Sequence, residues 1–385
     1  MNRLKAACII IILFAACSSQ PETEIPEEIA ALENLTVFPA DSEPSMTINL
    51  EPAGSFGDTD EVIIGNLFGF VADHSGRVFI ADGSENTIHA YNPDGSYLQS
   101  LGREGGGPGE FQGIGSLKVD NEYLYAMDWN QRKLNAFSLE DFSFSHTVSM
   151  MREDHGIEEL NGAYPQEYFI SSDNTFLVQY GLPFTPDNLD EERSYPFYRL
   201  NQEGEFISDQ VLSIRAPEIL YNSSGPMIMF SPFGRRSILR TANDDRIVTA
   251  WLEDFLIKFY SPDGTYEKAI YYPYKKAALD RDQVVNRYED ERMRRVIRNA
   301  DAPDTWPALN SIIVDDENRL WVSTIPDDDE VYDWWVLNDG GELLARFPWP
   351  REKYISEITN GSLYTRETEE ETGLVEVVQY RIELM

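Results

Sequence analysis

The sequence predicts an all-β protein in which a four-stranded unit is repeated six times around a ring. The first unit occupies residues 70–101 and contains four short β-rich runs, separated by turn residues such as Gly76 and the Asn-Pro-Asp-Gly sequence at 92–95. Short β-rich runs at regular spacing indicate an antiparallel meander. One meander cannot bury both of its faces, so it needs copies of itself on either side. The fold that meets this need with six copies is a six-bladed β-propeller.

Five further segments repeat the pattern of the first. The fourth unit copies its turn most closely, with Ser-Pro-Asp-Gly at 261–264, and the sixth unit lacks one strand. The glycine-rich segment 102–109 predicts a connector between blades and not a phosphate loop, because a strand follows it and no Gly-Lys-Ser/Thr sequence does. The five further units lie at 117–137, 168–211, 239–270, 312–347 and 355–384.

Two short β-like runs, at residues 35–38 and 46–50, precede the first complete unit. A ring of blades closes most firmly when a strand from one terminus completes the blade made by the other, because this removes an exposed strand edge. We therefore expect one of these N-terminal strands to pair with residues 375–384 and complete the last blade.

One helical insertion, at about residues 279–300, interrupts the repeats. Apolar residues recur near helical spacing between 283 and 298, and Asp280 or Asp282 can cap the helix. The insertion concentrates arginine in an acidic chain, and we expect these arginines to pair with neighbouring carboxylates. Two alternatives are a wall facing an anion at one end of the channel and a helix that docks a partner protein. The residues that would make the docking contacts are Arg294, Arg295 and Arg298.

The first 34 residues predict an export signal and a tether. Residues 1–16 join a basic start to an apolar run that is too short to span a bilayer, which is typical of a signal peptide. Residues 13–17, Leu-Phe-Ala-Ala-Cys, resemble a bacterial lipobox with Phe14 where leucine is usual, and they imply a lipid on Cys17 that anchors the chain to a membrane. A signal peptide without a lipid is the alternative. The acidic residues 17–34 predict a solvated tether.

The residues that follow Cys17 bear on localisation and on redox chemistry. Ser18 and Ser19 resemble the sorting signal of outer-membrane lipoproteins in Gram-negative bacteria, which implies a periplasmic or surface-facing protein of the cell envelope. The other cysteine, Cys8, lies in the segment that would be removed, so the mature chain would have no intrachain disulfide.

Composition limits the classes of partner. The chain has 67 Asp and Glu against 31 Lys and Arg, a formal net charge of −36, which argues against nucleic-acid binding. Its 385 residues, 42% of them hydrophobic, suffice for one large core, so we expect residues 35–385 to form one monomeric propeller.

Two sequence patterns carry a resemblance to a known family. Residues 72–82 read apolar-Asp-x-x-Gly-x-apolar-apolar-apolar-x-Asp, and residues 105–111 read Gly-Gly-Gly-Pro-Gly-Glu-Phe. This combination resembles the NHL/TolB-like six-bladed β-propellers, and among them the bacterial lipoprotein type. The resemblance implies the fold but says little about activity, because propellers serve many functions.

The sequence contains few patterns that are typical of enzymes. The sequence has no Gly-x-Ser-x-Gly or His-Glu-x-x-His motif, and its four histidines are scattered. We expect His89 to be structural and no cofactor to be bound. The aspartates that close the β-rich runs should bond to the backbone of the turns, with calcium in the channel as the alternative. These aspartates are Asp73, Asp82, Asp120 and Asp128.

Propellers bind ligands mostly through loops at one end of the axial channel. Arginines and aromatic residues in the connectors to the innermost strands would suit a carboxylated, sugar-like or peptide ligand, and packing of the rim is their alternative role. We therefore predict a module that binds a small ligand or an envelope protein. The alternative is a periplasmic propeller enzyme, a metal-dependent lyase or a hydrolase, since NHL-type propellers include an amidating lyase; counterparts of its metal-binding histidines are not found here. The candidate residues at the channel mouth are Arg103, Glu104, Phe111, Arg235, Arg236, Trp306 and Asn310.

Overall fold

The computed structural model describes residues 25–151, 156–184, 192–221, 228–369 and 372–385. The expected signal peptide, residues 1–16, and the expected lipidation site, Cys17, lie outside these residues. The chain divides into two units, Met1–Leu32 and Glu33–Met385. In the first unit the structure describes one helical turn, α1 (Glu27–Ala30). None of the described helices is long and apolar enough to cross a membrane.

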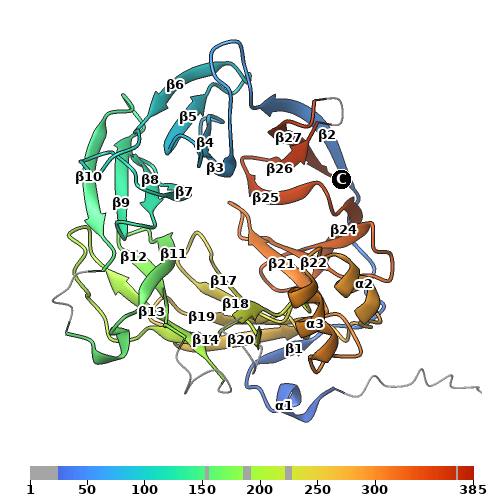
Figure 1. Cartoon of the computed structure of the whole chain (residues 1–385). Coiled ribbons are helices and arrows are strands. Elements are labelled where there is room, and N and C mark those ends of the chain that lie inside the picture. Colours follow the sequence, from blue (N-terminus) through green and yellow to red (C-terminus); the bar gives the residue numbers. More distant parts are fainter. Residues whose placement is uncertain (1–24, 152–155, 185–191, 222–227, 370–371) are drawn as a thin grey trace, which may run out of the picture. The chain divides into compact units, whose positions relative to one another are not determined.

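Within the described residues, the second unit consists of six β-sheet blades arranged around an axis (Figure 1), which confirms the predicted all-β six-bladed propeller. The first three blades, from the innermost strand outward, are β3 (Leu67–Ala72), β4 (Val78–Asp82), β5 (Thr87–Tyr91) and β6 (Tyr97–Leu101); β7 (Ile114–Val119), β8 (Tyr123–Asp128), β9 (Lys133–Ser138) and β10 (Phe144–Ser149); and β11 (Tyr164–Ile170), β12 (Phe176–Gly181), β13 (Ser194–Leu200) and β14 (Leu212–Arg215).

The other three blades follow the same plan. They are β17 (Ser237–Thr241), β18 (Ile247–Trp251), β19 (Leu256–Tyr260) and β20 (Tyr266–Tyr271); β21 (Leu309–Val314), β22 (Leu320–Thr324), β23 (Val331–Leu337) and β24 (Leu343–Pro350); and β25 (Tyr354–Thr359), β26 (Ser362–Thr368), β27 (Val375–Leu384) and β2 (Ile48–Phe56).

The N-terminal segment of the second unit runs along the outer edges of three blades. Strand β2 pairs antiparallel with β27 and is the outermost strand of the sixth blade, which confirms the predicted closure. Before it, the backbone N–H groups of Ser45 and Met46 donate to carbonyl groups of β24 in the fifth blade. Strand β1 (Leu35–Val37) adds in parallel to β20 as a fifth strand of the fourth blade, a pairing that the sequence did not predict.

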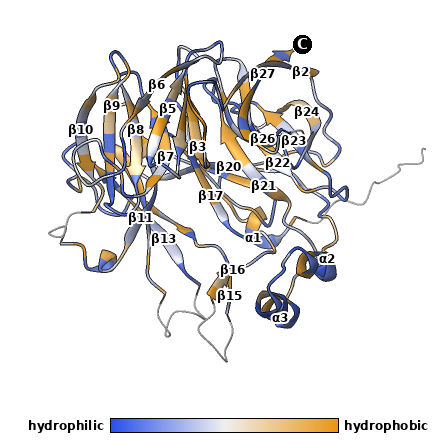
Figure 2. Cartoon of the chain, turned by 45° about the horizontal axis from the view of Figure 1, so that its top comes forward, coloured by the Kyte–Doolittle hydropathy of each residue, from blue (hydrophilic) through white to orange (hydrophobic). Residues whose placement is uncertain are grey.

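The hydrophobic core is divided among the interfaces between neighbouring blades. Each of six buried clusters joins side chains from two adjacent blades, including the pair formed by the sixth blade and the first. Figure 2 shows this pattern as apolar colour concentrated in the strands. Trp321 on β22, which is completely buried, packs with Leu363 on β26 in this way. Burying a side chain of this size contributes roughly 3 kcal/mol, so the blades stabilise one another.

The aspartates at the ends of the strands hold turns and connectors, as predicted. Asp73 and Asp120 accept backbone N–H groups in the turn between the first and second strands of their blades. Asp82 and Asp128 accept backbone N–H groups of the connectors that lead into the same blades, at Gly65, Asn66 and Gln112.

Two insertions form a small subdomain beside the ring. The hairpin of β15 (Ile219–Tyr221) and β16 (Ile228–Phe230) comes from the connector between the third and fourth blades, and α2 (Arg281–Asn286) and α3 (Glu291–Asn299) come from the next connector. Their apolar side chains share one buried cluster, to which the hairpin contributes Leu220 and Met229. We call these four elements the connector subdomain, and Figure 2 shows them projecting together from one end of the ring.

The prediction of one continuous helix over residues 283–298 was wrong, because the segment forms two helices. Asp280 caps α2 by accepting the backbone N–H groups of Asp282 and Gln283, as predicted. Asp290 caps α3 by accepting the N–H of Arg292. Aspartate is favoured at an N-cap and disfavoured inside a helix, so Asp290 starts a new helix. A short 3-10 helix, Glu158–Leu160, lies in the connector between the second and third blades.

Candidate functional site

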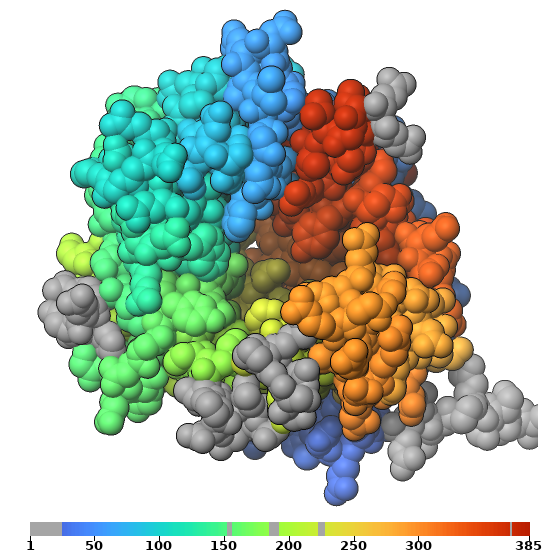
Figure 3. Space-filling model, in the orientation of Figure 1, coloured from blue at the N-terminus to red at the C-terminus, as the bar shows by residue number. Residues whose placement is uncertain are grey.

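The axial channel has two distinct ends. Because the strands of each blade alternate in direction, the connector from one blade enters the next blade at the same end of the ring every time. This connector end carries the connector subdomain and faces the viewer in Figures 1 and 3, and the opposite turn end carries the turns between the first and second strands of the blades. Figure 3 shows that the connector end is hollowed at its centre.

Two chambers lie along the axis. The turn-side chamber has a volume of about 390 Å³ and is lined by residues of all six innermost strands. The connector-side chamber has a volume of about 310 Å³ and is lined mainly by residues of the third and fourth blades, with Ser311 and Tyr354 from the fifth and sixth. Phe169 and Arg240 line both chambers and therefore stand at the boundary between them.

Arg240, on β17, is a cation with few protein partners. Its Nη1 donates to the carbonyl oxygen of its neighbour Leu239 at 2.8 Å, and no carboxylate of the described residues lies at ion-pair distance. Burial lowers the pKa of Arg240, and the more distant Glu167 and Tyr354 oppose this only in part. The guanidinium has five N–H donors in a plane, so several remain for a group that enters the channel.

Lys118 and Glu167 form an ion pair beside Arg240. The Nζ of Lys118, on β7, lies 3.5 Å from Oε1 of Glu167, on β11, and 4.9 Å from the centre of the Phe169 ring. Both side chains are about one-third exposed, at 29% and 35%. Lys118 therefore neutralises Glu167 in part, and Arg240, at the boundary of the two chambers, has no close counter-ion among the described residues.

Glu357, on β25, lies in the wall of the turn-side chamber. Its Oε2 accepts the backbone N–H of Ala72, on β3, at 2.8 Å. Burial raises the pKa of Glu357 to about 8, although this hydrogen bond and the nearby Lys118 act in the opposite direction. At neutral pH the carboxyl group therefore carries a proton most of the time.

Exposed aromatic side chains surround the mouth at the connector end. Tyr354, which is 51% exposed, lines the connector-side chamber at the start of β25. Phe68 and Tyr164 occupy the same place near the starts of β3 and β11, and Trp129 lies in the loop between β8 and β9 at that end. Flat aromatic faces in a partly polar mouth suit the apolar face of a ring or a side chain.

The seven residues predicted for the channel mouth are spread over several places. Arg236 lines the connector-side chamber and donates from Nη2 to the carbonyl oxygen of Asn310 at 2.9 Å. Arg235 instead pairs with Glu253, which also binds Lys276. Apart from Arg236, none of the seven is among the described residues that line either chamber.

The remaining predicted residues belong to the connectors themselves. Arg103 is 79% exposed and pairs with Glu110 at 2.7 Å. Glu104 is exposed and its backbone bridges to Phe111, whose side chain is completely buried in the core between the first and second blades. Trp306 packs in the core of the connector subdomain, 5.5 Å from the guanidinium carbon of Arg287. The expectation of a Phe111 side chain at the channel mouth was therefore wrong.

The arginines of α3 are largely paired with their own helix, as the sequence predicted. Arg294 pairs with Glu291 at 2.7 Å and donates to the carbonyl oxygen of Tyr288. Arg298 lies 3.7 Å from the same glutamate, and Arg295 is exposed. Much of the positive charge of α3 is therefore already balanced.

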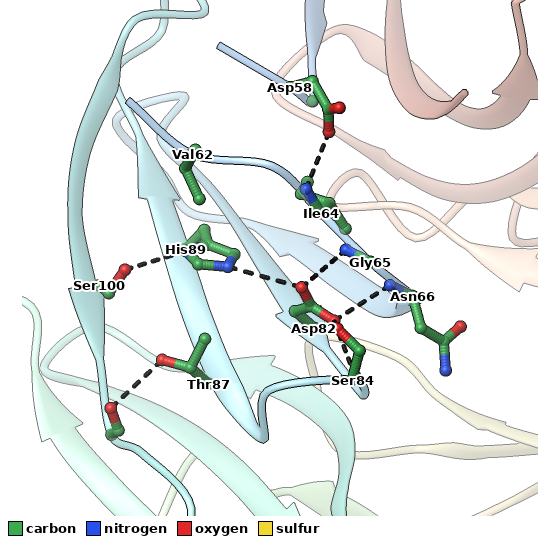
Figure 4. A network of polar contacts seen from close by, with 12 residues as sticks. Asp58, Val62, Ile64, Gly65, Asn66, Asp82, Ser84, Thr87, His89 and Ser100 are labelled. Atoms are coloured by element: carbon green, nitrogen blue, oxygen red, sulfur yellow. Dashed lines mark hydrogen bonds and ion pairs between the residues drawn. The ribbon is translucent and has the colours of Figure 1, made fainter. Parts of the chain in front are cut away.

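A second polar network, around His89, is structural. His89 Nδ1 lies 2.9 Å from Oγ of Ser100, and Nε2 lies 3.8 Å from Oδ2 of Asp82 (Figure 4). Burial lowers the pKa of His89, so the ring is neutral. The second blade repeats the arrangement with Asn135 and Thr147, bonded at 3.1 Å, in place of His89 and Ser100. Because the second blade makes the same cross-strand contact without a histidine, the contact stabilises the blade, which agrees with the structural role predicted for His89.

The charged residues inside the channel were not predicted, because they lie on the innermost strands and not in the connectors. Lys118, Arg240 and Glu357 each interrupt an otherwise largely apolar innermost strand, in Leu-Lys-Val, Leu-Arg-Thr and Ser-Glu-Ile sequences. A charged residue in the middle of such a strand is the signal that could have found them, since buried charges need a specific reason. Within the described residues, no group of three or more His, Cys, Asp or Glu side chains could hold a metal ion.

Comparisons with known proteins agree with the fold. Residues 58–213 match the DUF5128 family, described as a 6-bladed beta-propeller. No curated protein matches the chain. A solved structure of Bacteroides fragilis NCTC 9343, described as a "Putative exported protein", has 13% identity and a TM-score of 0.53, covering 91% of this chain and 99% of its own. A member of the DUF4221 family from Bacteroides vulgatus ATCC 8482 has 10% identity and a TM-score of 0.54, covering 88% and 99%. The class of the protein is thus a six-bladed β-propeller.

Proposed function

We propose that this protein is a binding protein of the bacterial cell envelope that holds a small carboxylate ligand in its axial channel. The observation that carries the proposal is Arg240, a guanidinium at the boundary of two chambers that, among the described residues, donates only to a backbone carbonyl. Burying such a group without a counter-ion is unfavourable. A carboxylate fits its planar donors in a bidentate fashion and would provide that counter-ion.

The mouth suggests how the rest of such a ligand is held. A volume of about 310 Å³ in the connector-side chamber is near the lower end for small-molecule sites. Tyr354 offers an apolar face at the entrance, and Arg236 a second cation. We therefore infer that the carboxylate binds Arg240, and that a ligand long enough to extend into the connector-side chamber packs an apolar face against the aromatic mouth.

Calorimetric titration of the purified chain would test this proposal. The ligands are the short alkanoates from acetate to hexanoate and the corresponding primary amides, which have nearly the same shape without the charge. We expect each bound carboxylate to exceed its amide in affinity by about tenfold or more, the usual strength of a charge-assisted hydrogen bond.

Variants assign the effect to one residue. Arg240→Gln should remove the preference for carboxylates, whereas Arg381→Gln, on the exposed face of β27, should leave it unchanged. Equal affinity for alkanoates and amides, or an Arg240→Gln variant that keeps the preference, would refute the proposal.

We also propose that the protein is exported and anchored through a lipid on Cys17, as in the bacterial lipoprotein-type propellers that its repeats resemble. The support is the leader, in which a basic start and an apolar run precede the lipobox-like residues 13–17. Cells that express the chain with labelled fatty acid should incorporate label into it, and Cys17→Ser should abolish the label and release the protein from membranes. Cys8→Ser is the matched control and should change neither. Labelling that persists in Cys17→Ser would show that the anchor is wrong.

A further inference from the structure

We propose that Glu357 forms a subsite for a cationic amine, so that the ligand of the channel is a zwitterion such as an amino acid or a short peptide. This inference rests on the proposed carboxylate site at Arg240 and adds a second point of recognition. Arg240 and Glu357 line the same turn-side chamber but come from different blades, the fourth and the sixth. A ligand with both charges could therefore bridge them inside one cavity of about 390 Å³.

The first step of the argument is that the Glu357 carboxyl group is held in place. Its Oε2 accepts the N–H of Ala72 across the seam between the sixth blade and the first, at 2.8 Å. Among the described residues, no protein group donates a hydrogen bond to Oε1, and no cation lies at ion-pair distance from either oxygen. One oxygen thus fixes the orientation and the other remains for a ligand.

The second step is that Glu357 differs from the two other carboxyl groups that line this chamber, Asp315 and Asp316. Asp315 pairs with Arg319 at 2.7 Å, and Asp73, which precedes the lining residue His74, pairs with Arg77 at 2.6 Å. Asp316 accepts the backbone N–H of Asn360 at 2.7 Å. Asp316 is exposed in the β21–β22 turn, whereas Glu357 is half-buried in the wall of the chamber and has no cation at ion-pair distance among the described residues. An amine inside the chamber would therefore meet Glu357.

The third step concerns protons. The titratable and charged groups that face Glu357 from the surrounding elements are Asp73 and His74 from the β3–β4 turn, Lys118 from β7, Arg240 from β17, Asp315 and Asp316 from the β21–β22 turn, and Tyr364 from β26. The backbone N–H of Ala72 and the charge of Lys118 favour the ionised form, but burial outweighs them and raises the pKa of Glu357 to about 8. An ammonium group favours the carboxylate, so its binding should release a proton at neutral pH.

The experiment compares ω-aminoalkanoates with alkanoates of the same chain length, because the two series differ only in the amine. The amine of an ω-aminoalkanoate stays protonated to about pH 10, so between pH 6 and 8.5 the change in affinity reports the protein. At pH 8.5 at least one aminoalkanoate should bind about tenfold or more tightly than its alkanoate, and this ratio should shrink as the pH falls to 6. The best chain length then measures the spacing between the two subsites.

Two further measurements assign the amine preference to Glu357. Titrations of the unmodified protein at pH 7 in phosphate and in Tris should show a fraction of a proton released with the aminoalkanoate and none with the alkanoate. Glu357→Gln keeps an acceptor for the Ala72 N–H, and it should bind alkanoates as before but lose the amine preference and the proton release.

The possible results separate the two proposals. If alkanoates bind but aminoalkanoates bind no more tightly at pH 8.5, the amine subsite is refuted and the carboxylate site stands. If the preference survives in Glu357→Gln, or no proton is released, the assignment to Glu357 is refuted. If neither series binds, the carboxylate site fails and the amine subsite fails with it.

Discussion

Replacing Phe56 with alanine tests whether β2 holds the ring closed. Phe56 is the last residue of β2 and is 1% exposed, and its ring lies 6.3 Å from that of Tyr91 in the first blade and 6.5 Å from that of Tyr364 in the sixth. It therefore joins the last blade to the first. Next to it, the Tyr91 hydroxyl donates to the carbonyl of Gly57 at 2.8 Å, which fixes the chain as it leaves the strand.

The expected loss follows from this burial. Removing a fully buried phenylalanine ring costs about 3–5 kcal/mol, because both the transfer free energy and the contacts around the cavity are lost. For a domain of this size that loss lowers the melting temperature by roughly 5 °C. Phe68→Ala is the matched control, since Phe68 is 47% exposed and its removal should cost less than about 1 kcal/mol.

Urea denaturation, followed by tryptophan fluorescence, measures both variants against the parent protein. The reasoning predicts a lower midpoint for Phe56→Ala and a nearly unchanged midpoint for Phe68→Ala. If the two variants lose the same stability, the seam between the sixth blade and the first does not depend on β2 in the way that the contacts indicate.

Three other predictions concern charge. Asp82→Ala removes the acceptor of three backbone N–H groups and should cost about 2–3 kcal/mol in urea denaturation. The exposed Asp94→Ala should cost clearly less, and equal losses would contradict the role of Asp82 in holding the connector. Because the folded-state pKa of Glu357 is raised to about 8, the contribution of its protonated form to stability is lost as the pH rises from about 4.5 to 8. The free energy of unfolding of Glu357→Gln should therefore rise relative to that of the parent protein over this pH window. A difference between the two proteins that does not change with pH would count against the raised pKa. Since the net charge is −36, added salt should accelerate the association of an alkanoate in stopped-flow measurements, and slower association would show that the local field is positive.

The fold was predictable because its information is local. Short β-rich runs and turn residues indicate each blade in the sequence. The missing strand of the sixth unit indicated that an N-terminal strand completes it, and this strand is β2. The place of β1 was not predictable in this way. Its three residues pair with β20 through backbone hydrogen bonds, and such an edge accepts many sequences. Likewise, the apolar spacing of the helical insertion did not reveal that Asp290 would start a second helix.

The candidate site was less predictable, for a geometric reason. Arg240 and Glu357 are 117 positions apart in the sequence and meet in one chamber only because the ring closes. Propensity and turn chemistry describe neighbours along the chain, and they do not say which strands face the axis at the same height. The position of Arg236 at the chamber was predictable because it lies in a connector. Phe111 also lies in a connector, but its side chain is buried in the core.

The N-terminal segment also sets how the ring responds to a pulling force. A load applied at residue 33 reaches β1 first, whose pairing with the fourth blade covers Leu35 to Val37 and is extended by backbone hydrogen bonds of Asn34 and Phe38. It reaches β2 only afterwards, where the pairing extends from Ile48 to Phe56 and the closing seam lies. Strand β1 can therefore detach and lengthen the chain under tension while the sixth blade stays complete. The N-terminal segment thus places a short strand pairing between a load on residue 33 and the strand that closes the ring.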